Sequence, residues 1–84
     1  MLMIEVLESM SRQQPTEFGI LIDEATTTGV TYVGKYNPEA TFGTGRDIFQ
    51  IIIIDERTAT THVYYAENSR SFNKIWDSRV SYLK

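Results

Sequence analysis

Residues 47–54 read Asp-Ile-Phe-Gln-Ile-Ile-Ile-Ile, and a polar group, Asp-Glu-Arg-Thr at 55–58, follows directly. Isoleucine is β-branched and suits a pleated strand better than a helix. Alternation along a strand sends every second side chain to the same face. One face would then carry Ile48, Gln50, Ile52 and Ile54, and the other Phe49, Ile51 and Ile53. Both faces are largely apolar, so we predict a central strand that is covered on both sides.

Two β-hairpins are predicted around this strand. Residues 59–66, which include His62, Val63, Tyr64 and Tyr65, follow the polar turn and form its return strand. Residues 18–24 and 30–36 form an earlier hairpin, with Gly29 as the residue of positive φ in its turn. Gly34 lies inside the second of these strands and indicates a bulge or a close backbone approach. Residues 1–7 are too short a pattern to separate a strand from one or two helical turns, and residues 8–16 indicate a loop.

The end of the chain has a different period. Apolar and long side chains recur at helical spacing from residue 69 onwards and would form one helical face, namely Phe72, Ile75, Trp76, Arg79 and Val80. Ser71 or Ser69 is the expected N-cap of this helix. Trp76 has the largest apolar side chain and is predicted to anchor the helix to the sheet. Residues 82–83 are expected to leave the helix.

The fold class predicted from these elements is α+β and mostly β. It has an antiparallel sheet of four or five strands, open or curled into a small barrel, and one short C-terminal helix. The 84 residues form a single domain, 1–84, without cysteine. A domain of this size has a thin core, and disulfides are excluded as supports. The strand with two apolar faces therefore predicts a homo-oligomer of this chain.

Composition also bears on partners and chemistry. The net charge is −3 and the eight basic residues are scattered, so nucleic acid is not an expected partner. No apolar run reaches the length of a membrane span, and the start of the chain lacks the basic region of a signal peptide. One histidine, His62, and no cysteine leave no triad and no zinc ligand set, so we expect no enzyme, cofactor or metal. Asp23-Glu24 and Asp55-Glu56 are read as solvated turn charges.

The segment 37–46, Asn-Pro-Glu-Ala-Thr-Phe-Gly-Thr-Gly-Arg, is the longest irregular stretch. Its glycines can present backbone N–H groups to a phosphate, which Arg46 can bind bidentately. It lacks the Lys-Ser/Thr ending of a P-loop, so a connection whose glycines only relieve strain stays an alternative. Tyrosines of the chain can stack on a base or pair across strands. The predicted ligand-binding residues are Tyr36, Phe42, Gly43, Gly45, Arg46 and Arg79.

An ordered set of short motifs resembles a family of small, mostly uncharacterised proteins encoded by tailed phages and prophages. The motifs are Tyr-Val-Gly-Lys at 32–35, the Pro38 turn, the Gly/Thr-rich loop, Phe-Gln-Ile at 49–51, and Phe-x-x-Ile-Trp-Asp-x-Arg at 72–79. The resemblance covers roughly residues 30 to 83. The chain departs from it at Phe49 and Tyr65, where the family tends to have Trp, at Ile52 and Ile53, where it tends to have basic residues, and at Glu39, where it tends to have Gly. The resemblance implies a phage origin and a non-catalytic role, but no ligand.

Two classes of function stay open. The first is a virion- or tail-associated structural or interaction module, with itself and other virion proteins as partners. The second is a binding protein that sequesters a phosphate-bearing small molecule, such as a nucleotide-type host immune signal. Its site would be the glycine loop, Arg46 and the aromatic side chains, in pockets between subunits. The expected location is the cytoplasm of the infected bacterial host or the virion.

Overall fold

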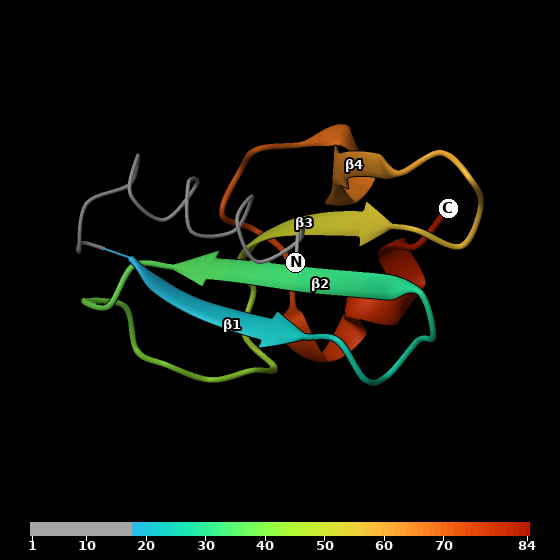
Figure 1. Cartoon of the computed structure of the whole chain (residues 1–84). Coiled ribbons are helices and arrows are strands. Elements are labelled where there is room, and N and C mark those ends of the chain that lie inside the picture. The colour runs from blue at the N-terminus through green and yellow to red at the C-terminus, as the bar shows by residue number, and fades with distance from the viewer. Residues whose placement is uncertain (1–17) are drawn as a thin grey trace.

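The computed structural model describes residues 18–84, so the predictions for residues 1–7 and 8–16 lie outside the described residues (Figure 1). Four strands form one antiparallel sheet in chain order: β1 (Gly19–Asp23), β2 (Val30–Tyr36), β3 (Gln50–Asp55) and β4 (His62–Tyr65). Two 3₁₀ helices follow, η1 (Ala66–Asn68) and η2 (Trp76–Tyr82). The predicted fold class, α+β and mostly β, is confirmed. In the described residues the sheet is open, with β1 and β4 at its edges, and not curled into a barrel.

The first hairpin matches its prediction closely. β2 has the predicted bounds, Gly29 has φ of 79°, and the N–H of Val30 donates to the carbonyl of Thr27 at 3.1 Å. The second hairpin is shorter than expected, because β3 begins at Gln50 and β4 at His62. Phe49 instead exchanges backbone hydrogen bonds with Lys74, at 3.0 and 2.8 Å. The chain before β3 is therefore held by the C-terminal segment and not by the sheet.

β3 is covered on both sides, as predicted. Ile51 and Ile53 are fully buried in one cluster with Phe49 and Trp76. Ile52 and Ile54 are 2% exposed and pack with Val33 on the opposite face. The prediction for Ile48 is wrong: it was placed on the face of Ile52 but packs against the cluster of Phe49 and Trp76. The alternation does not extend to residue 48 because the strand begins only at Gln50.

The helix predicted from residue 69 or 71 is wrong in start and in type. The observed helix begins at Trp76, follows the extended residue Ile75, and has no side-chain N-cap. Phe72 is 40% exposed and stacks on Phe18, with ring centroids 5.5 Å apart. The bridge between Lys74 and Phe49 holds this part of the chain extended. Tertiary pairing thus overrides a helical spacing of side chains. Leu83 is extended, as expected, but Tyr82, which was also expected to leave the helix, is the last residue of the helix.

Trp76 anchors η2 to the sheet, as predicted. Trp76 is 7% exposed, and its side chain lies against Gly34 of β2, where a Cβ would be 2.6 Å from Trp76 Cε3. The close backbone approach predicted at Gly34 is therefore confirmed, and β2 is paired without interruption on both sides. No helix in the described part of the chain is long and apolar enough to cross a membrane.

Candidate functional site

An aromatic group marks the corner where β2 ends and the long loop begins. Tyr36 lies 5.1 Å from Phe42 and 5.5 Å from Phe49, measured between ring centroids. Phe49 is fully buried, whereas Phe42 is 52% exposed. The three rings therefore form a continuous path from the core to the surface. Phe42 is at the outer end of this path, where its ring packs on Tyr36 and is open to solvent.

The glycine loop is held at two points. The N–H of Arg46 donates to the carbonyl of Gly43 at 3.0 Å, and the N–H of Asp77 donates to the carbonyl of Thr44 at 2.9 Å. A Cβ on Gly43 would be 2.9 Å from Arg46 Cδ, so the aliphatic part of Arg46 lies over this glycine. Arg46 is exposed. The loop thus presents a cation and Phe42 on a backbone that the start of η2 supports.

Five of the predicted site residues share this corner: Tyr36, Phe42, Gly43, Gly45 and Arg46. Arg79 has a different environment. Its Nε donates to Asp23 Oδ2 at 2.8 Å, its Nη1 donates to the carbonyl of Trp76, and its guanidinium lies 4.6 Å from the centre of the Trp76 ring system. The structure therefore places Arg79 at the C-terminal end of β1, where it connects η2 to the sheet.

Asp23 and Asp55 each form an ion pair with an arginine, Arg79 and Arg57 respectively. Burial alone would raise the pKa of Asp23, but hydrogen bonds from Thr26, Ala25 and Arg79 outweigh it and hold the pKa well below its usual range. Side-chain and backbone hydrogen bonds from Arg57 lower the pKa of Asp55 to about 2. Carboxylates held ionised in this way are weak proton acceptors near neutral pH.

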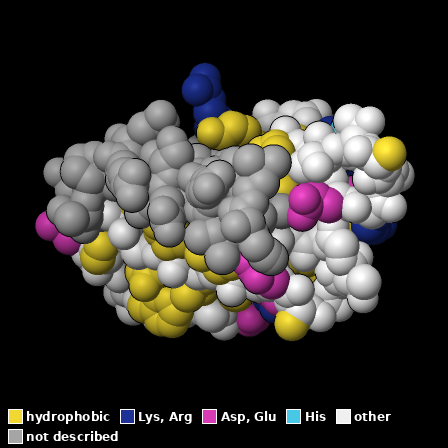
Figure 2. All heavy atoms as spheres, viewed as in Figure 1, with side chains coloured by type: hydrophobic (Ala, Val, Ile, Leu, Met, Phe, Trp, Pro, Cys, Tyr) yellow, Lys and Arg dark blue, Asp and Glu magenta, His cyan; other side chains and the backbone are white. Residues whose placement is uncertain are grey.

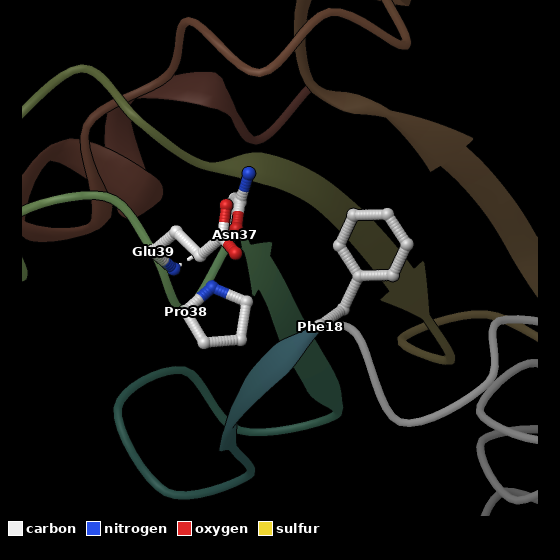
Figure 3. Close-up of a pocket in the computed structure, with 4 residues that line it drawn as sticks. All are labelled: Phe18, Asn37, Pro38 and Glu39. Carbon is white, nitrogen blue, oxygen red and sulfur yellow. Dashed lines mark hydrogen bonds between the residues drawn. The ribbon is translucent and has the colours of Figure 1, made fainter.

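A pocket of about 400 Å³ lies beside the start of the loop, between the beginning of β1 and the residues that follow β2 (Figure 3). Phe18 lies on one side of it, and Asn37, Pro38 and Glu39 on the other. The N–H of Glu39 donates to Asn37 Oδ1 at 2.9 Å, which fixes this turn. None of the predicted site residues lines the pocket. No local motif could have indicated it, because folding alone brings residue 18 to residues 37–39.

A second pocket, of about 450 Å³, lies where β3 ends and β4 begins, and its described lining is Asp55, Arg57, Thr58, His62, Tyr64 and Lys84. Arg57 Nη2 donates to Asp55 Oδ2 at 2.7 Å and to the carbonyl of Lys84 at 2.9 Å. Lys84 Nζ donates to Asn68 Oδ1 at 2.7 Å. The arginine and the lysine are thus already engaged within the chain, and His62 is an exposed strand residue.

Comparison with protein-family models, with curated proteins and with solved structures found no match. Among residues 18–84, no three His, Cys, Asp or Glu side chains gather where they could hold a metal ion.

Proposed function

We propose that the protein is a non-enzymatic, phage-encoded oligomeric module that acts by surface packing, as a virion- or tail-associated structural or interaction protein. The observation that carries this proposal is the set of exposed large apolar side chains, each 40–54% exposed: Ile22, Phe42, Val63, Phe72 and Val80. Figure 2 shows apolar side chains open to solvent on one face of the molecule. Single exposed apolar residues are ordinary, but five in so small a domain, two of them (Ile22 and Val63) on the edge strands of the sheet, favour protein contacts.

The sheet register sharpens this proposal. Ile22 of β1 is opposite Val33, which is opposite Ile52. Val63 of β4 is opposite Ile54. Residues that are directly opposite point to the same face of a sheet. Ile22 and Val63 therefore lie at the two margins of the face whose centre is formed by Val33, Ile52 and Ile54.

The test of this role is particle association. The protein should co-purify with virions in a fixed ratio to the other particle proteins, and light scattering should give the mass of an oligomer. Absence from purified particles would remove the virion role, and a monomer at high concentration with cooperative unfolding would remove the oligomer.

A second function, the binding of a phosphate-bearing small molecule of nucleotide type, is favoured by Phe42 and Arg46. Both are exposed, they are separated by three residues, and the aromatic path and the hydrogen bond of Asp77 support the loop that carries them. Phe42 would stack on the base and Arg46 would pair with the phosphate. A thermal-shift screen against nucleotides and cyclic nucleotides tests this. A ligand at a hundred times its Kd adds about 2.7 kcal/mol, which raises Tm by several degrees in a small domain.

A further inference from the structure

We propose that β1 is the surface through which two copies of the chain associate. β1 of one copy pairs antiparallel with β1 of the other, which joins two four-stranded sheets into one continuous sheet. This inference rests on the oligomer proposed above and names its interface.

The first observation is the position and sequence of β1. It lies at one edge of the sheet and, among the described residues, pairs only with β2 (Figure 1). Exposed edge strands usually carry a lysine, a proline or a bulge that discourages pairing with another chain. Gly19–Asp23 has no lysine or proline, and its five consecutive pairs with β2 leave no bulge. β4, at the other edge, is only four residues long and is followed directly by η1. A very short edge strand is one of the features that discourage pairing with another chain.

The second observation is that β1 is complementary to itself. A twofold axis through Leu21 pairs all five residues of the strand with those of a second copy. Ile22, which is 51% exposed, then lies opposite Ile20 of the partner subunit. Asp23 lies opposite Gly19 of the partner subunit, so no like charges face each other across the new pair. Asp23 is also already paired with Arg79, at 2.8 Å.

The third observation is the continuity of the apolar face. Ile22, Val33 and Ile52 form one row across three strands. Ile20 and Ile22 are on the same face, since they are two residues apart on a strand. Pairing through β1 adds Ile20 of the partner subunit to the end of this row, next to the exposed side chain of Ile22.

The first test uses the matched pair Ile22→Lys and Val63→Lys in the full chain. Both residues are about half exposed on the same sheet face, at opposite edges. In Ile22→Lys the lysine would face Ile20 of the partner subunit, which disfavours the pairing. Sedimentation velocity should therefore show an association constant at least tenfold lower than that of the wild type. Val63→Lys should sediment like the wild type. Dissociation by Val63→Lys and not by Ile22→Lys would overturn the assignment to β1.

The second test reads the register directly. The chain has no cysteine, so Ile20→Cys and Ile22→Cys each introduce a single thiol. Positions 20 and 22 are opposite each other in the proposed pair, so oxidation of an equimolar mixture should give disulfide-linked dimers of one variant with the other. Either variant alone should give a much lower yield of disulfide-linked dimer. Equal yields in all three samples would overturn the register.

The two proposals fail in different ways. A wild-type oligomer that persists in Ile22→Lys, with no disulfide in the mixture, would overturn the β1 interface and leave the proposed oligomer standing. A wild-type monomer at all concentrations would overturn both.

Discussion

The indole of Trp76 lies so close to the backbone of Gly34 that a Cβ on residue 34 would be 2.6 Å from Trp76 Cε3 and 2.7 Å from Trp76 Cζ3. No real Cβ makes so close a contact. The glycine is therefore required by the packing of η2 on β2, and not by backbone torsion, since only Gly29 among the described glycines has a positive φ. One small residue in a central strand and one large residue in a distant helix together fix how the C-terminal segment covers the sheet.

Gly34→Ala should destabilise the protein by about 1–3 kcal/mol, as overpacking of a buried site does. Urea denaturation of the variant and the wild type measures this loss. Gly45→Ala is the matched control, because a Cβ there would be 3.4 Å from Asp77 Oδ2, an ordinary contact. Equal stability of Gly34→Ala and the wild type would show that Trp76 does not lie on this strand.

Trp76→Ala should be the most damaging substitution in η2, at about 3–5 kcal/mol. Small domains have about 5 kcal/mol of stability or little more, so this variant should be close to unfolding. Gly34→Ala should cost much less in the Trp76→Ala background than alone, because the indole that clashes with the new methyl group is gone. Additive losses in this double-mutant cycle would contradict the contact.

The strands were predictable because their signals are local. Alternation along the chain predicts the observed bounds of β2. The turn sequence predicts the positive φ of Gly29, and the glycine within a strand predicts the close approach at Gly34. The C-terminal helix was mispredicted because Phe72 and Ile75 have helical spacing, but the chain between them pairs with distant residues. Phe72 stacks on Phe18 and Lys74 bridges to Phe49, and neither partner can be deduced from a repeat along the chain.

The ion pair between Asp23 and Arg79 should make stability depend on pH. Both side chains are largely buried, with 12% and 19% exposed, and the pKa of Asp23 is lower in the folded protein than in the unfolded chain. A group of this kind stabilises the fold above its unfolded pKa, and this contribution is lost as the pH falls. Asp23→Asn should therefore lower Tm at pH 6 by several degrees, from a loss of about 1–3 kcal/mol.

The difference in Tm between Asp23→Asn and the wild type should narrow as the pH falls from about 5 to about 2. Over this range the Asp23 carboxylate of the unfolded wild-type chain takes up a proton while the folded protein still holds it ionised, so the unfolded state is favoured increasingly. Asp55→Asn is the control, since Asp55 also has a lowered pKa but pairs with Arg57, which is 42% exposed. Its effect on Tm at pH 6 should be smaller than that of Asp23→Asn, because exposed ion pairs contribute little. A difference for Asp23→Asn that stays constant from pH 6 to pH 2 would show that its charge does not stabilise the fold.

The candidate site was predictable only in part. The glycine spacing and the composition of residues 37–46 predict a binding loop, and five of the six predicted residues do lie together at the corner where β2 ends and this loop begins. Arg79 is the sixth predicted site residue, but the fold places it beside Asp23, a residue 56 positions earlier in the chain. The pockets beside Phe18 and Arg57 were missed because each is lined by segments that only folding brings together.

Arg46→Ala tests the binding of a phosphate-bearing small molecule. If Arg46 pairs with the phosphate, its loss should weaken nucleotide binding by about 1.5–3 kcal/mol, or roughly ten- to more than a hundredfold. Stability should change by less than about 0.5 kcal/mol, as at other exposed positions. Arg70→Ala is the control, because Arg70 is an exposed arginine in another segment. Calorimetric affinities that are unchanged in Arg46→Ala, for every nucleotide that the wild type binds, would remove the loop as the site.

In the function proposed here, the chain works as an oligomer that forms through apolar residues of its sheet. Size-exclusion chromatography with light scattering, on the full wild-type chain over a wide range of concentrations, measures whether this oligomer exists. The predicted result is a discrete particle whose mass is an integer multiple of the single chain, and which Ile22→Lys reduces while Val63→Lys does not. A single-chain mass at the highest concentration, with cooperative unfolding, would contradict the claim.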